Sequence, residues 1–373
     1  MKKIKKKIFI CATEQSGDNI GKEILKEILK KRKNLIIDGV GGFKMQPYMN
    51  HQFYNLKDFK SIGIIEIIFS LKKYIGMIKK LKEIIIIKNY DLIITIDSPD
   101  FNYPLCKKIK KLGYKNKIIH IVAPTVWAWR KNRAKKFANI FDQMFTLFDF
   151  ENKYFEKYNL STTCIGHPIF FIKKIKNINS NKNLIAFLPG SRFGEVKSLF
   201  KYYELAYKEI LKNNIKSNIF IPTLPHLHKE ILLRTKHWKI KTIVEVNEKL
   251  IKKYFAKTKH ALVCSGTASL EVAKMGIPQL VIYKLNIFTE IIASFFVNVK
   301  FANIINIIED KMIIPEIVNS KLNNIDFLKN YKKLLFDNKS NKKQVSNVLK
   351  VINKIQKNKS PFKIASKKIL KIL

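Results

Sequence analysis

Short apolar runs alternate along this chain with longer segments whose apolar residues recur at helical spacing. The runs lie at residues 8–12, 35–40, 92–96, 118–122 and 144–147, and again at 184–188, 218–222, 242–246, 261–264 and 279–283. Short runs that are mostly apolar are typical of strands buried on both faces. Strands that alternate with helices form parallel sheets, because a parallel crossover needs a connection as long as a helix. The alternation therefore predicts an α/β chain of the doubly wound class.

A polar stretch at residues 170–182, rich in Asn and Lys, interrupts this alternation. The length of 373 residues is sufficient for two domains. We expect two Rossmann-like domains that face a central cleft, the first over 1–169 and the second over 183–345, with 170–182 as the linker. Residues 346–373 are predicted to form a helical, basic tail that packs back on the body.

The net charge is +44, from 72 Lys and Arg against 28 Asp and Glu. Such a charge attracts polyanions: nucleic acid, an anionic membrane or a phosphorylated substrate. Only five of the basic residues are Arg, the residue that makes bidentate contacts to bases. Lys, Ile and Asn, which are abundant here, have AT-rich codons, so we attribute most of the charge to base composition. We therefore expect no specific nucleic-acid partner.

The N-terminal sequence and the cysteine pattern indicate the cellular compartment in which the protein is expected. The start MKKIKKK resembles that of a signal peptide, but the apolar stretch after it ends at Glu14, too early for a cleavage site. Four scattered Cys without a CxxC pair indicate reduced thiols and give no zinc signature. No apolar run reaches the ~18 residues that a spanning helix needs. We expect a cytoplasmic protein without a transmembrane segment.

Polar loops follow the first and third predicted strands, at the edge of an open α/β sheet where ligands bind. Glu14, Ser16 and Gly17 follow the first strand, where small residues let a ligand approach the next helix's N–H groups. Alternatively, Ser16 or Asp18 simply caps that helix. Asp97 and Asp100 follow the third strand and are candidates for a general base and its partner. The alternative there is a proline-containing turn.

The segment 123–130 contains two Trp residues and ends in an Arg. Trp127 and Arg130 are predicted to form an apolar wall with an anion contact at the cleft. The alternative is that the Trp side chains fill the core. A basic helix is expected over 131–139.

Two further loops open helices in the second half. Gly190, Ser191 and Arg192 form a strand–loop–helix junction where a phosphate could sit on the helix N-terminus with Arg192 as a clamp. The other reading of Arg192 is an exposed turn residue. The loop after the strand at 261–264 is predicted to bind a diphosphate and, through its glutamate, the ribose hydroxyls, unless that glutamate only completes a capping box. Its candidate residues are Ser265, Gly266, Thr267 and Glu271.

Apolar residues recur at helical spacing over 62–82, with lysines between them. A basic amphipathic helix of this kind can lie in a membrane interface. The alternative is a helix whose apolar stripe packs on the sheet. The candidate membrane or acyl-chain contacts are Ile64, Ile65, Ile68 and Leu71.

Taken in order, these segments resemble the lipid-A-disaccharide synthase family, glycosyltransferases of lipopolysaccharide biosynthesis. The matching motifs are TEQSGD at 13–18, GVGGFKM at 39–45, IGIIEI at 62–67, IDSPDFN at 96–102, PTVWAWR at 124–130, GHP at 166–168, FLPGSRFGE at 187–195 and SGTASLE at 265–271. The chain departs from the family pattern at a few positions. Thr13 replaces a glycine, Ile305 precedes Asn306 where the family has proline, and Asp310-Lys311 and the segment 316–319 differ from the family's Gly-Arg and Glu-Leu-Leu-Gln.

The resemblance implies a GT-B fold and an inverting transfer from UDP-2,3-diacylglucosamine to 2,3-diacylglucosamine 1-phosphate. The products are the β(1→6) disaccharide 1-phosphate and UDP. It implies Asp100 as base with support from Asp97, Arg192 at the diphosphate, Glu271 at the ribose and Asn306 at a diphosphate or sugar group. No cofactor or metal is expected, because no DxD-like loop is present. The cytoplasmic face of the inner membrane is the expected surface partner, and a homodimer is compatible with the sequence. Rival activities are another UDP-sugar transferase or an epimerase of the same fold.

Overall fold

The computed structural model describes residues 5–59, 64–128, 130–171, 182–264, 266–284 and 300–373, without the side chains of 64–71 and 320. The chain forms two compact units, Met1–Phe171 with Ile355–Leu373, and Ile172–Lys354. We call them the first and second units.

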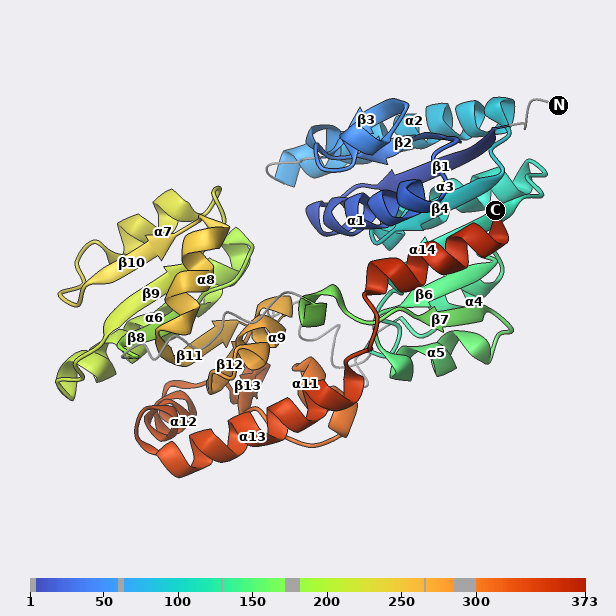
Figure 1. The fold of residues 1–373 in the computed structure, drawn as a ribbon. Helices are drawn as coiled ribbons and strands as arrows, with labels where there is room; N and C mark the ends of the chain where they lie inside the picture. Colours follow the sequence, from blue (N-terminus) through green and yellow to red (C-terminus); the bar gives the residue numbers. More distant parts are fainter. Residues whose placement is uncertain (1–4, 60–63, 129, 172–181, 265, 285–299) are drawn as a thin grey trace. The chain divides into compact units, whose positions relative to one another are not determined.

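The first unit is built on a parallel seven-stranded sheet of order β3-β2-β1-β4-β5-β6-β7 (Figure 1). Its strands are β1 (Lys6–Ala12), β2 (Leu35–Gly41), β3 (His51–Asn55), β4 (Leu92–Ile96), β5 (Lys117–Ile121), β6 (Gln143–Thr146) and β7 (Ser161–Cys164). Its helices are α1 (Gln15–Lys31), α2 (Ile64–Lys88), α3 (Pro99–Lys111), α4 (Arg133–Ala138), α5 (Asp149–Glu156) and α14 (Pro361–Ile372). Short 3₁₀ turns lie at Gln46–Tyr48, Leu56–Phe59 and Pro168–Phe171.

Both faces of this sheet are covered, as the apolar runs predict. In β1, Ile8 and Ile10 pack with α1 and α14, whereas Phe9 and Cys11 pack with α2 and α3 on the other face. Because successive strand side chains point to opposite faces, a strand between two helical layers is apolar at most positions. The last helix, α14, lies beside α1, and its Ile369 is fully buried (Figure 1).

The second unit has a parallel six-stranded sheet of order β10-β9-β8-β11-β12-β13. Its strands are β8 (Leu184–Leu188), β9 (Asn218–Pro222), β10 (Thr242–Glu245), β11 (Thr258–Cys264), β12 (Gln279–Tyr283) and β13 (Glu316–Val318). Its helices are α6 (Phe193–Lys212), α7 (His228–Thr235), α8 (Glu248–Ala256), α9 (Thr267–Lys274), α11 (Ile304–Glu309), α12 (Asn324–Phe336) and α13 (Asn338–Ile355), and a 3₁₀ turn lies at Asn319–Lys321. The α/β, doubly wound prediction is confirmed in both units.

The two sheets share one topological feature that positions ligand sites. Each sheet grows outward in two directions from a central pair, β1 with β4 in the first unit and β8 with β11 in the second. At such a switch point the loops from the carboxyl ends of the two central strands diverge and leave a crevice. The loops predicted to carry chemistry at residues 14–17, 97–100, 190–192 and 265–267 follow these four strands.

Three strands are absent from the sequence-based prediction. They are β3, β7 and β13, and all lie at sheet edges. Edge strands keep one side open to solvent, so their sequences HQFYN, STTC and EIV lack the long apolar runs of the central strands. The predicted linker at 170–182 lies mostly outside the described residues, and the predicted limit at 345 falls inside α13.

Candidate functional site

A cavity of about 480 Å³ lies at the carboxyl ends of β8 and β11 in the second unit. It contains five of the predicted binding residues and Arg192, and we call it the β8–β11 cavity. Its lining residues are Leu188, Gly190, Ser191, Arg192, Glu195, Pro222, Thr223, Leu224, Ile251, Phe255, Cys264, Gly266, Thr267, Ala268 and Glu271. Residues predicted from two separate loops thus line one cavity, and Ser265 itself lies outside the described residues.

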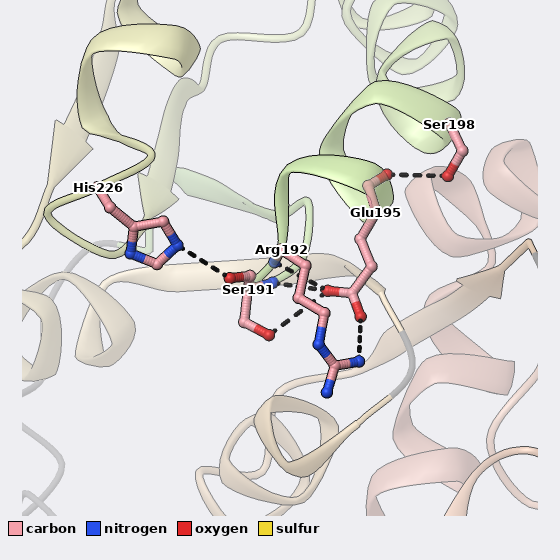
Figure 2. Close-up of polar contacts among 5 residues, drawn as sticks. All are labelled: Ser191, Arg192, Glu195, Ser198 and His226. Carbon is pink, nitrogen blue, oxygen red and sulfur yellow. Dashed lines mark hydrogen bonds and ion pairs between the residues drawn. The ribbon is translucent and has the colours of Figure 1, made fainter. Parts of the chain in front are cut away.

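The loop before α6 is organised by the carboxylate of Glu195 (Figure 2). Its Oε2 accepts from the backbone N–H of Ser191 at 2.8 Å and of Arg192 at 3.2 Å. Its Oε1 accepts from Nη1 of Arg192 at 3.2 Å. On the other side of the loop, Nε2 of His226 lies 3.2 Å from the carbonyl oxygen of Ser191. The helix N-terminus predicted to hold a phosphate is thus held by the chain's own carboxylate.

Glu271 lies on the first turns of α9 and also lines the cavity. Burial raises the pKa of its carboxyl, the charge of Glu248 adds to the rise, and the ammonium groups of Lys252 and Lys274 oppose it. A carboxyl group that lines a cavity can accept hydrogen bonds from two neighbouring sugar hydroxyls. This position fits the role predicted for Glu271.

Thr223 is a cavity residue that the sequence analysis did not select. It follows β9, and its buried Oγ1 has no hydrogen-bond partner among the described residues. A buried hydroxyl without a partner is rare in proteins, so a ligand group is a natural partner for it. Ile251 and Phe255 add an apolar wall. The strand-end rule used for other loops would have found Thr223, but its neighbours Pro222 and Leu224 carry no polar signal.

Asn306 does not lie in this cavity. It is fully buried, and its Oδ1 accepts from the N–H groups of Ile313 at 2.8 Å and Ile314 at 2.9 Å. Its Nδ2 donates to the carbonyl of Ile314 at 2.7 Å and to Glu316 at 3.2 Å. These four bonds use the whole capacity of an amide side chain. The structure thus leaves Asn306 no group for the diphosphate or sugar contact predicted for it, and gives it the role of holding the 311–316 loop.

At the first unit's switch point, the loops after β1 and β4 are joined by side chains. Ser16 Oγ donates to Asp97 Oδ2 at 2.9 Å, and Ser98 Oγ donates to Glu14 Oε1 at 3.1 Å. Asp97 and Ser98 have φ values of 55° and 46°, in the left-handed region that non-glycine residues rarely adopt. Such strained positions cluster at functional sites. Gly17 is closely packed, since a Cβ there would lie 3.1 Å from the Ala12 Cβ and 3.2 Å from the Ile96 carbonyl oxygen.

Asp18, on α1, has a structural role. Its carboxylate is 1% exposed and accepts from the N–H groups of Gly42, Lys44 and Met45. This ties α1 to the GVGGFKM segment. The sequence analysis considered Asp18 only as a helix cap.

Asp100, the predicted base, lies at the start of α3 with 82% of its side chain exposed, where it pairs with the guanidinium of Arg133. Arg133 is a neighbour that the sequence analysis missed, because it lies inside a run of basic residues with nothing to single it out.

Trp127 is buried, 8% exposed, and its Nε1 donates to Oε1 of Glu151 at 3.3 Å. Glu151 Oε2 also accepts from the N–H groups of Leu147 and Phe148 at the start of α5. Burial raises the pKa of Glu151 to about 7, while these hydrogen bonds oppose the rise. Trp127 therefore packs inside the first unit, as in the core-filling alternative. Arg130, by contrast, is exposed with φ 54°.

The predicted amphipathic helix is α2, and it is longer than the predicted 62–82 segment. The side chains of Ile64, Ile65, Ile68 and Leu71 lie outside the described residues. Farther along α2, Met77, Ile78 and Leu81 are buried in the sheet's core cluster. The carboxyl-terminal part of α2 thus packs on the sheet. Within the described parts of the chain, no helix combines the length and apolar character needed to cross a bilayer.

Comparison with known proteins identifies the family to which the chain belongs. A family model described as lipid-A-disaccharide synthetase matches residues 8–369. The lipid-A-disaccharide synthase of Rickettsia prowazekii is 36% identical over 378 residues, which cover 97% of this chain and 98% of that protein. The enzyme of Rickettsia canadensis is 34% identical over 372 residues, 96% of each chain.

Solved structures share the fold at low sequence identity. A UDP-GlcNAc 2-epimerase from Neisseria meningitidis bound to UDP-GlcNAc superimposes with a TM-score of 0.62 at 13% identity, covering 99% of this chain and 100% of its own. MurG from Acinetobacter baumannii gives a TM-score of 0.60 at 11% identity, covering 98% and 99%. The two Rossmann-like units and these neighbours establish the GT-B fold. The chain therefore belongs to the lipid-A-disaccharide synthetase family, and it is a glycosyltransferase of lipid A biosynthesis.

Proposed function

We propose that this enzyme transfers 2,3-diacylglucosamine from UDP to the 6-hydroxyl of 2,3-diacylglucosamine 1-phosphate, with inversion at the anomeric carbon. The bond from the anomeric carbon to the acceptor oxygen forms as the bond to UDP breaks, and the hydroxyl proton passes to a base. The observation that carries the proposal is the β8–β11 cavity, in which a guanidinium, small loop residues and an acidic acceptor surround a space at a switch point. Family membership supports the choice of sugars.

The second unit takes the UDP part of the donor. Arg192 and the helix N-termini after Gly190 and Gly266 stabilise the charge of the departing diphosphate. Glu271 accepts hydrogen bonds from the ribose hydroxyls. These groups line the same cavity, as binding of a diphosphate joined to a ribose requires.

The first unit takes the acceptor. Asp100 is the base for the 6-hydroxyl, since its carboxylate is exposed at the start of α3. Asp97 supports it by fixing the loop through Ser16. The apolar start of α2 and the basic surface serve the acyl chains and an anionic membrane face, so the enzyme acts as a peripheral protein on the inner membrane.

A mixed-micelle assay with both acylated substrates, which follows UDP and disaccharide, tests this reaction. Wild type should form the disaccharide without added metal, and Asp100→Ala should lower kcat by about a hundredfold or more, the size expected for loss of a general base. Asp149→Asn is the matched control, because Asp149 is also an exposed aspartate paired with a cation, Lys357. Folded wild type that forms no disaccharide would refute the acylated donor, and unacylated UDP-sugars would then be tested.

A further inference from the structure

One carboxylate occupies the hydrogen-bond donors with which the β8–β11 cavity would bind a diphosphate. Glu195 holds the N–H groups of Ser191 and Arg192 and the guanidinium of Arg192 at once (Figure 2). The Ser191 hydroxyl points to the same Oε2 atom at 3.4 Å. Carboxylate and phosphate oxygens are both anionic acceptors, so they compete for such donors.

The loop is shaped around this inward position of Glu195. Gly190 has φ +116°, and a Cβ built on it would lie 2.6 Å from Oε2 and 2.7 Å from Cβ of Glu195. Glycine therefore meets both the backbone and the space requirement at this position. The Glu195 side chain is 15% exposed, whereas its partner Arg192 remains 79% exposed and accessible to a ligand.

The acidic residues that line the cavity oppose the binding of an anionic diphosphate. In a chain with a net charge of +44, the cavity is lined by two acidic residues, Glu195 and Glu271, and one basic residue, Arg192. A diphosphate that entered beside both carboxylates would meet repulsion in a partly buried site. Its binding is favourable when one carboxylate leaves, and Glu195 is the one that sits on the donors the diphosphate needs.

We propose that Glu195 is an internal competitor of the donor's diphosphate. It holds Ser191 and Arg192 in the ligand-free enzyme, releases them when the diphosphate binds, and takes them back as UDP departs. This inference rests on the proposed function, which supplies the diphosphate. UDP binds only the molecules in which Glu195 has moved away, so the apparent affinity for UDP is lower than the affinity of those molecules. UDP is also released faster, because Glu195 competes for the same donors. Glu195 is thus a positioning residue that acts through Arg192.

Isothermal titration of the full chain with UDP, and separately with pyrophosphate, tests the competition. Glu195→Gln keeps the shape and one acceptor oxygen but removes the charge, so both ligands should bind about tenfold more tightly than to wild type. Glu195→Ala should shift affinity in the same direction. Glu230→Gln is the matched control, because it removes a carboxylate paired with Arg234 on α7, outside the cavity. In the transfer assay, kcat and the donor KM should both fall in Glu195→Gln, because UDP leaves more slowly.

A double-mutant cycle with Arg192→Gln separates competition from a purely structural cap. Competition predicts that replacing Glu195 changes UDP affinity less once Arg192 is gone. Equal or weaker binding of both ligands to Glu195→Gln, with only a lower melting temperature, overturns the proposal. If wild type binds pyrophosphate but not UDP, the proposed donor is wrong, and the pyrophosphate comparison still decides the role of Glu195.

Discussion

Ser16 and Asp97 are 81 positions apart in the chain, yet the hydroxyl of one donates to the carboxylate of the other over 2.9 Å. The parallel bond from Ser98 to Glu14 fixes the same pair of loops from the other side. Loops that are cross-linked by side chains hold their groups in place before a ligand arrives, which lowers the entropy lost on binding. The first unit's switch point is therefore already organised without ligand.

Removing the Ser16 hydroxyl should impair catalysis more than folding. Ser16→Ala frees the Asp97 carboxylate from its partner on α1, so we expect kcat to fall about tenfold while the melting temperature changes little, since the residue is exposed. The micelle assay and thermal denaturation measure the two effects. Asn19→Ala, which removes an exposed hydrogen bond to Lys44 from the same helix, is the control. Equal kcat in wild type and Ser16→Ala would show that this link is dispensable.

Donor binding should depend on the ionisation of Glu271. In the proposed ribose contact the ionised carboxylate is the stronger acceptor for both hydroxyls, and burial raises the pKa of Glu271 above the usual 4.5. The affinity for UDP should therefore fall as the pH is lowered through this raised pKa, and titration calorimetry over a pH series would show it. The charge of Glu248 contributes to the rise, so Glu248→Gln should move the midpoint to lower pH. A midpoint unmoved by Glu248→Gln would contradict this electrostatic coupling.

Glu151 should make stability decrease as the pH rises. The pKa of its carboxyl is about 7 in the folded state, against an ordinary value of 4.5. Its stabilising contribution is therefore complete below about pH 4.5 and is lost as the pH rises through 7. The free energy of unfolding of wild type relative to Glu151→Gln should be higher at pH 5 than at pH 8, by up to about 3 kcal/mol. Urea denaturation at both pH values measures it, with Glu156→Gln on the same helix as the control. If the difference in unfolding free energy between wild type and Glu151→Gln increased with pH, the prediction would be wrong.

Asn306→Ala separates a structural role from a ligand contact. The substitution leaves the buried N–H groups of Ile313 and Ile314 without their acceptor, so the free energy of unfolding should fall by about 3 kcal/mol or more. Asn330→Ala removes an exposed amide that bonds the Asp326 carbonyl and is the control. If Asn306→Ala unfolds like wild type but binds UDP weakly, Asn306 is a ligand residue after all.

The central strands and the four switch-point loops could be predicted, because they carry local signals. A strand buried on both faces is apolar at most or all positions, as β4 and β8 are. A loop that lets a backbone approach a ligand needs small residues, as at Gly190 and Gly266. Edge strands such as β7 have no such requirement, and their sequences do not distinguish them from loops.

The sequence by itself determined the fold class, the family and the location of the β8–β11 cavity, because each depends on residue types at fixed spacing along the chain. The partners of those residues were decided only by tertiary structure. Glu195 accepts from the N–H groups of Ser191 and Arg192, Glu151 accepts from the Trp127 indole, and the Asn306 amide bonds to a neighbouring loop. A polar side chain can form hydrogen bonds with several different partners. Which partner it has depends on packing, which brings one group within reach and excludes water from the site.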